Sequence, residues 1–125
     1  MKYLLLMYVA ETIAPKFTPE ENHALAKDWG AYMKEAGAAG VLLDNNGLTP
    51  AADATTVRVR NDKTVTTDGP FAETHEQLAG YSLLNCKDLD EAISWAAKVP
   101  TAKYGAVEIR PSAIIFSDGS WHPAE

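Results

Sequence analysis

The feature that most constrains the fold is the first apolar segment, residues 2–9, with the sequence KYLLLMYV. Alternate residues of a β-strand point to opposite faces of a sheet. Tyr3, Leu5 and Met7 therefore share one face, and the equally apolar residues between them share the other. A strand that is apolar on both faces is covered on both sides. The segment thus predicts a buried first strand, because it is far shorter than the ~20 residues of a membrane-spanning helix.

Composition narrows the class of protein. A chain of 125 residues fits one domain, residues 1–125. The single cysteine, Cys86, excludes an internal disulfide and is typical of a reducing cytoplasm. Glu11 follows the first apolar run without a clear small-residue cleavage site, so we expect a cytoplasmic protein rather than a secreted or membrane protein. The formal net charge of -6 opposes nucleic-acid binding.

The first predicted helix has a clear beginning. Thr18 is placed as its N-cap, Pro19 occupies the first helical position, and Glu21 lies three residues after the cap. Gly37 is the expected stop. The positions that share one face at helical spacing are apolar: Leu25, Trp29, Tyr32, Met33 and Ala36.

A second helix is predicted from Leu89 to Val99, with Asp88 as its cap. Its expected apolar stripe is Leu89, Ala92, Ile93 and Ala96. Trp95 lies about 120° from this stripe by helical geometry, so we expect it to pack at an edge.

Further strands are predicted within residues 40–50, 78–86 and 106–111, with a last one at 113–121 that turns at Asp118-Gly119. Residues 54–69 predict a hairpin, with Val57, Val59 and Val65 inward and Arg58 and Arg60 outward. This order predicts an α+β, ferredoxin-like sandwich with an inserted β-hairpin. Both helices then cover one sheet face. A second copy of the chain is the simplest cover for the other.

The run TTVRVRNDKTVTTDGPFAETHEQLAGYSLLNCKDLDEAISWAAKVP, with MKYLLLMY before it and GAVEIRP after it, resembles the DGPF branch of the YCII-related proteins. The resemblance extends from Met1 to Pro111. It implies a dimeric α+β barrel whose function is unsettled. Genes of such proteins often stand beside those of extracytoplasmic-function sigma factors, which suggests a sigma factor as a partner. The barrel fold also includes cofactor-free monooxygenases, so fold alone does not choose an activity.

The wider YCII group has been proposed to be enzymatic through a histidine–aspartate pair in a cleft. That pair does not transfer cleanly to this chain. His23 falls away from the apolar stripe of the first helix and is expected on the surface. Asp28 lies nearer the edge of the stripe, but no histidine matches it.

Asp68, in the motif Asp68-Gly69-Pro70-Phe71, has two interpretations. In the structural one, its carboxylate accepts backbone N–H groups of the turn, and Gly69 allows the bend. In the functional one, the turn holds the carboxylate beside a cleft as a base or a cation ligand. The two interpretations are compatible, and we take Asp68 as the catalytic candidate.

The candidate substrate-binding residues are Phe71, Glu73, Tyr81 and Arg110. The aromatic rings suit a pocket wall, although core packing also explains them. Arg110 suits a carboxylate, although a surface ion pair is the commoner role. His23, His75 and His122 lack the spacing of metal ligands, so we expect no metal and no cofactor.

Two functions remain open at this point. The first is a small-molecule enzyme or binder with a cleft beside the DGPF loop. The alternative is a non-catalytic accessory module in signalling or transcription. An ordered anionic or aromatic ligand in the cleft would favour the first, and an empty, closed cleft with a separate apolar surface patch would favour the second.

Overall fold

The computed structural model describes residues 1–12 and 16–124 of the chain. Its elements, in chain order, are the strand β1 (Lys2–Ala10), the helix α1 (Pro19–Ala38), β2 (Leu42–Gly47), a short 3-10 helix (Ala51–Asp53), β3 (Thr55–Arg60), β4 (Lys63–Asp68), β5 (Glu76–Asn85), the helix α2 (Leu89–Ala96), a second 3-10 helix (Pro100–Lys103), β6 (Ala106–Pro111), β7 (Ile114–Ser117) and β8 (Ser120–Pro123).

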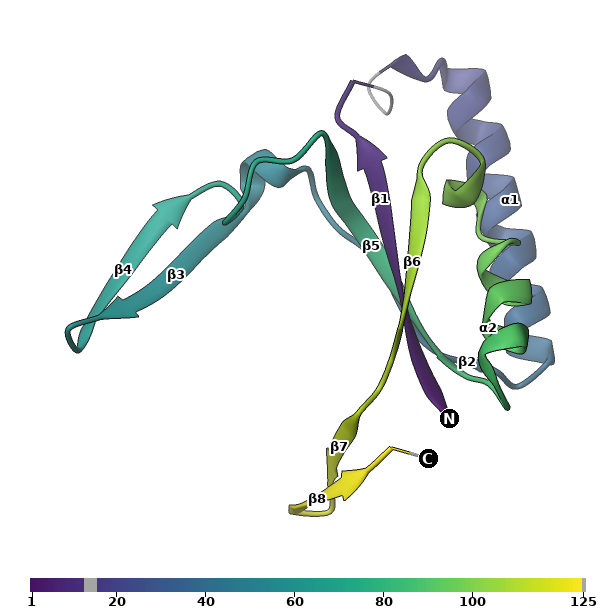
Figure 1. Ribbon diagram of the computed structural model, residues 1–125. Coiled ribbons are helices and arrows are strands. Elements are labelled where there is room, and N and C mark those ends of the chain that lie inside the picture. Colours follow the sequence, from purple (N-terminus) through teal and green to yellow (C-terminus); the bar gives the residue numbers. More distant parts are fainter. Residues whose placement is uncertain (13–15, 125) are drawn as a thin grey trace.

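Four strands form an antiparallel sheet in the order β2-β5-β1-β6, so β1 is central. Both helices lie on one face of this sheet (Figure 1). Among the described residues, no helix lies on the opposite face, and we call it the open face. The arrangement is α+β and compatible with the ferredoxin-like fold.

The predicted start of α1 is confirmed. The Thr18 hydroxyl accepts from the Glu21 amide at 3.1 Å, and the Glu21 carboxylate accepts from the Thr18 amide at 3.1 Å. The predicted stop at Gly37 is wrong by one turn. The helix continues through Ala38, and Gly40 with its φ of 74° reverses the chain. Glycine adopts this left-handed conformation readily, so the helix ends where that conformation is used.

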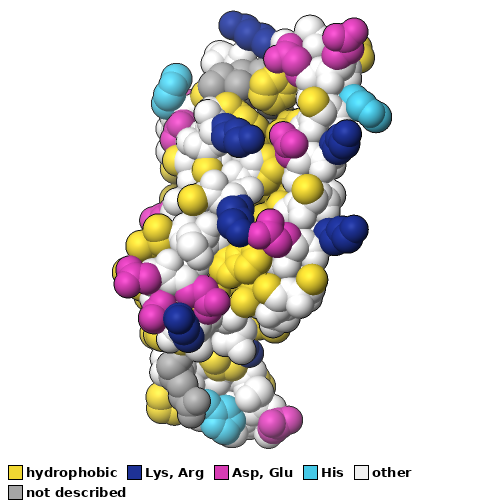
Figure 2. All heavy atoms as spheres, turned by 90° about the vertical axis from the view of Figure 1, so that its right-hand side faces the viewer, with side chains coloured by type: hydrophobic (Ala, Val, Ile, Leu, Met, Phe, Trp, Pro, Cys, Tyr) yellow, Lys and Arg dark blue, Asp and Glu magenta, His cyan; other side chains and the backbone are white. Residues whose placement is uncertain are grey.

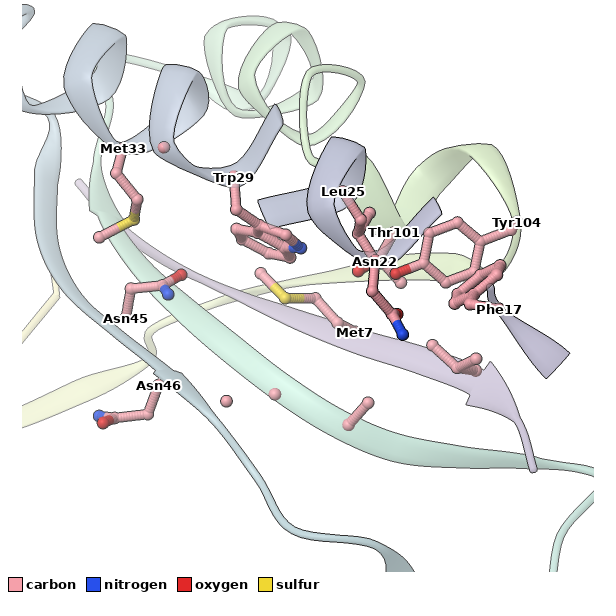
Figure 3. Close-up of a pocket in the computed structure, with 15 residues that line it drawn as sticks. Met7, Phe17, Asn22, Leu25, Trp29, Met33, Asn45, Asn46, Thr101 and Tyr104 are labelled. Carbon is pink, nitrogen blue, oxygen red and sulfur yellow. The ribbon is translucent and has the colours of Figure 1, made fainter. Parts of the chain in front are cut away.

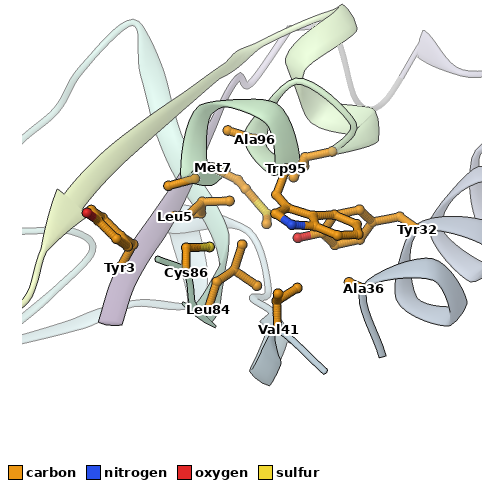
Figure 4. Packing of buried hydrophobic residues seen from close by; sticks show 12 residues of the cluster. Tyr3, Leu5, Met7, Tyr32, Ala36, Val41, Leu84, Cys86, Trp95 and Ala96 are labelled. Atoms are coloured by element: carbon orange, nitrogen blue, oxygen red, sulfur yellow. The ribbon is translucent and has the colours of Figure 1, made fainter. Parts of the chain in front are cut away.

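The inner face of β1 forms the centre of the core, and its outer face lies on the open side. Tyr3, Leu5 and Met7 are buried beneath the helices, with Leu5 completely inaccessible. Figure 4 shows these side chains between the two helices and the sheet. Leu6 is only half-buried because its side chain points to the opposite face. The structure therefore decides which face of β1 the helices cover.

The predicted position of Trp95 is wrong. Its indole is only 8% exposed and belongs to the core, whereas Leu89 and Ile93 of the predicted stripe are 50% and 49% exposed. The physical reason is size. Ala36 of α1 and Ala92 of α2 are fully buried and small, so the ring fits where the two helices meet the sheet (Figure 4).

The β3–β4 hairpin projects away from the sheet on the open side (Figure 1), and we call it the arm. Its two-residue loop has φ values of 51° at Asn61 and 61° at Asp62, as a type I′ turn requires. The predicted inward valines are exposed. Val65 pairs with Arg58 and shares its face rather than that of Val57, because directly opposed residues lie on one face.

One glycine is required by the packing of β6 against β1. A Cβ atom on Gly105 would lie 2.1 Å from the backbone oxygen of Tyr8. We predict that Gly105→Ala lowers the free energy of unfolding by about 1–3 kcal/mol, as overpacking does. Gly37→Ala, in open space on α1, is the control and should raise it by about 0.5–1 kcal/mol. Urea unfolding compares the two variants, and equal stability would contradict the predicted clash.

Candidate functional site

A cleft of about 520 Å³ lies between α1 and the sheet, on the helix side of the molecule. Figure 3 shows Leu25, Trp29 and Met33 of α1 pointing toward β1 and β2. We call this space the α1 cleft. Its lining consists of Met7, Val9, Phe17, Asn22, Leu25, Trp29, Gly30, Met33, Asn45, Asn46, Gly47, Ala79, Gly80, Thr101 and Tyr104.

One face of α1 provides the roof of the α1 cleft. Leu25, Trp29 and Met33 follow one another at four-residue spacing, are only half-buried and line the cleft. Tyr32 and Ala36 alternate with them along the same stripe and are buried in the core. The Trp29 ring also packs edge-to-face against Tyr32, with ring centroids 5.7 Å apart. One helix face therefore contributes to both the core and the cleft.

On the sheet side, Met7 and Val9 of β1 and three small residues of β2 and β5 line the α1 cleft. The small residues, Gly47, Ala79 and Gly80, lie where β2 ends and β5 carries an irregularity in its pairing with β1. A Cβ atom on Gly80 would lie 2.7 Å from the backbone oxygen of Asn46. Glycine therefore lets β2 approach β5.

Two side-chain amides point into the α1 cleft. Asn22 comes from α1 and Asn45 from β2; Figure 3 shows Asn45 turned toward Trp29 and Asn22 at the other end of the cleft, near Phe17 and Tyr104. The buried Ser82 hydroxyl donates to the Asn45 carbonyl oxygen. Asn46 points the other way, because it binds Tyr81 on the open face. Adjacent residues of one strand thus serve opposite faces of the sheet.

Tyr32 is buried in the core close to Ser82. The Tyr32 hydroxyl is inaccessible and has no hydrogen-bond partner among the described residues. Burial raises the pKa of Tyr32, while the nearby Ser82 hydroxyl acts in the opposite direction. The phenol is therefore neutral at physiological pH. Burial likewise raises the pKa of the Cys86 thiol.

A second hollow, of about 700 Å³, lies at the base of the arm and includes the DGPF loop. Pro70, Phe71 and Leu78 line it, together with Tyr8 of β1. The Phe71 ring is 79% exposed. Such an apolar ring at the rim leaves one wall of this hollow to solvent within a single chain.

The DGPF turn is held by the backbone rather than by Asp68. The Gly69 amide donates to the Ala54 carbonyl at 2.7 Å, and the Thr56 hydroxyl donates to the Gly69 carbonyl at 2.8 Å. Gly69 has the φ of 97° that its predicted role requires. In the described chain, however, no donor binds the exposed Asp68 carboxylate, so the predicted cap is not formed.

Tyr81 and Arg110 lie on the open face of the sheet. The Tyr81 hydroxyl donates to Asp44 at 2.8 Å and accepts from the Asn46 amide at 2.8 Å. The Arg110 guanidinium lies 3.7 Å from the Glu108 carboxylate, which is the surface ion pair named above as the commoner role. The Tyr8 hydroxyl donates to the same Glu108.

The five predicted site residues therefore do not converge within one chain. Phe71 lines the hollow at the arm, Asp68 and Glu73 are exposed without lining it, and Tyr81 and Arg110 stand on strands separated by β1. In the part of the chain that the structure describes, no three metal-ligating side chains come together. Within that part, no helix is long and apolar enough to cross a membrane.

Sequence reasoning missed the α1 cleft. His23 and Asp28 are both exposed and neither lines it, so the position expected for His23 is confirmed. Two signals were available in the sequence: the polar pair Asn45-Asn46 directly before Gly47, and Trp29 in the apolar stripe of the first helix. Neither indicates a cleft until the separation between α1 and the sheet is known.

Because the Asp68 carboxylate forms no bond in the turn, we predict that Asp68→Asn and Asp68→Ala each change the free energy of unfolding by less than ~0.5 kcal/mol. Gly69→Ala is the positive control. It should cost about 1 kcal/mol or more, because alanine is strained at a positive φ. Denaturant melts of the three variants test this, and a loss for Asp68→Ala as large as that for Gly69→Ala would restore the capping role.

Comparison with known proteins agrees with the resemblance described above. The family model of the YCII-related domain matches residues 1–113. An uncharacterized protein of Rhizobium meliloti (strain 1021) is 36% identical over 116 residues, which cover 91% of this chain and 94% of that protein. A match over this length leaves little of the described fold outside the family domain. The chain belongs to the YCII-related family.

Proposed function

We propose that this protein binds a small molecule in the α1 cleft. The observation that carries the proposal is the lining of the cleft, which joins an apolar roof to two inward-pointing amides in a space of about 520 Å³. Small-molecule sites typically have volumes of roughly 300–1,000 Å³, apolar walls and a few placed polar groups. Trp29 supplies the largest apolar surface, and Asn22 and Asn45 supply the polar groups.

The chemistry of the lining favours binding over catalysis. General acid–base catalysis needs a titratable group within hydrogen-bond reach of the reacting atom. Among the described residues of the lining, only Tyr104 has a titratable side chain. Asp68, the catalytic candidate from the sequence, lies at the base of the arm, where β4 ends, and is not among them. A binding role therefore needs nothing that the cleft lacks.

The hollow beside the DGPF loop has a different character, and we propose that it belongs to a homodimer. The arm is exposed on both faces, with Val57 and Val59 58% and 60% exposed. An isolated two-stranded hairpin is marginally stable in water. The open face offers Leu4 and Leu6 beside the exposed Leu78. A second copy packed against this side would cover both regions and complete the dimeric barrel.

The binding proposal predicts that a residue can block the α1 cleft without harming the fold. Gly30 lines the cleft, and a Cβ atom there meets nothing within 4 Å. Gly30→Leu should therefore fill the space, keep or raise stability by about 0.5–1 kcal/mol, and abolish binding. Gly37→Leu is a matched control on the same helix, also in open space but outside the lining, and should retain binding.

The measurement is a fragment screen by thermal shift on the unaltered protein, since any native-state binder raises the melting temperature. Hits are then titrated calorimetrically against both leucine variants. Equal binding to the Gly30→Leu and unaltered proteins would place the site elsewhere. A screen without hits would favour the accessory-module alternative, for which the exposed Leu89 and Ile93 of α2 offer an apolar contact for a partner such as a sigma factor. Figure 2 shows the helix side, where hydrophobic side chains lie between charged ones.

The homodimer proposal predicts opposite effects for neighbouring leucines. Leu6→Lys places a charge on the open face and should give a folded monomer. Leu5→Lys buries a charge in the core and should prevent folding, because Leu5 is completely inaccessible. Sedimentation equilibrium gives the mass, and circular dichroism checks the fold. If the unaltered protein sediments as a monomer at micromolar concentration, the proposed dimer is wrong.

A further inference from the structure

Resting on the binding role proposed above, we infer that the ligand of the α1 cleft is an uncharged, flat aromatic molecule with a hydrogen-bond acceptor facing Asn45. Three features of the cleft lead to this class: its charge, its shape and the group that Asn45 presents. Each is independent of the others.

The first feature is the absence of charge. None of the described side chains in the lining is formally charged. A carboxylate or phosphate placed there would lose hydration without gaining a cation. The net charge of -6 on the chain would repel it further. An organic cation would find aromatic rings but no carboxylate, so it too would lose more hydration than the lining returns.

The second feature is the shape of the space. Trp29 and Met33 line it from α1, and Gly47 and Gly80 contribute backbone alone on the sheet side, next to Met7. β2 lies close against β5 at Gly80. Met33 and Met7 are flexible thioethers that make favourable contacts with aromatic rings. A space bounded by an indole, two thioethers and glycine backbone suits a planar ring better than a branched aliphatic group.

The third feature is the orientation of the Asn45 amide. Its carbonyl oxygen already accepts from Ser82, which is completely buried. The amide nitrogen, a donor, is therefore the group that remains for a ligand. The Tyr32 hydroxyl, which is buried close to Ser82, has no hydrogen-bond partner among the described residues. The ligand must then bring an acceptor to this end of the cleft.

The test uses three probes that share one ring system: 2-naphthamide, 2-naphthoate and 2-naphthylmethylammonium. Calorimetric titration of the full chain at pH 7 gives their affinities. We expect 2-naphthamide to bind at least ~10-fold more tightly than either ion, the cost of burying a charge without a partner.

Asn45→Asp provides the sharper arm of the experiment. It keeps the acceptor that Ser82 needs but replaces the amide donor by a carboxylate, so affinity for 2-naphthamide should fall ~10-fold or more. Asn85→Asp adds the same charge at an exposed position outside the lining, keeps the acceptor that the Met1 amine uses, and should leave affinity unchanged. Melting curves verify that both variants are folded.

The outcomes separate this inference from the proposal beneath it. If either ion binds as tightly as 2-naphthamide, or if Asn45→Asp binds it normally, the inferred ligand class is wrong while the cleft remains a site. If no probe binds but other fragments do, and Gly30→Leu removes them, the ligand class is again wrong and the binding role stands. If nothing binds in the cleft at all, both fail.

Discussion

The packing of the inner face of β1 against the two helices is the interaction on which the rest of the structure depends. Leu5 is completely buried at the centre of a strand that pairs with β5 on one side and β6 on the other. Tyr32 and Ala36 from α1 and Trp95 from α2 complete the same cluster. A fully buried aliphatic side chain of this kind stabilises a fold by roughly 1.5–3 kcal/mol. Because β1 is central, this contact also sets where each helix end and each sheet edge lies.

The α1 cleft lies beside that contact. Residues on one face of α1 divide between the core and the cleft: Tyr32 and Ala36 are buried, whereas Leu25, Trp29 and Met33 are only half-buried and line the space. Gly30 and Gly80 keep this space open from above and below. Protein interiors are normally close-packed, so an unfilled space of this size is unusual. Apolar walls with a few polar groups are typical of ligand-binding sites. The open face and the arm expose apolar surface of another kind, which suits a second copy of the chain.

The chain belongs to the YCII-related family, but membership does not identify a ligand or a reaction. These have to be inferred from the side chains of the chain itself. The histidine–aspartate pair proposed for the wider group has no counterpart in the lining of the α1 cleft. His23 and Asp28 are both exposed to solvent and lie outside that lining. The DGPF segment proves to be a backbone-held turn at the base of the arm. Function in this chain is therefore better sought beneath α1 than at the motif by which the sequence resembles its family.

The sequence by itself determined the elements and their caps. Local stereochemistry and periodicity, which need no distant contact, account for four features: the capping box at Thr18, the cap at Asp88, the strand β1 and the left-handed Gly69. Tertiary structure alone decided which face of β1 the helices cover, why Trp95 enters the core in place of Ile93, and that Phe71, Tyr81 and Arg110 lie apart. These outcomes depend on the space left between elements. Two-sided apolar strands and short helices have more than one usable face, and only the packing of all elements together selects one.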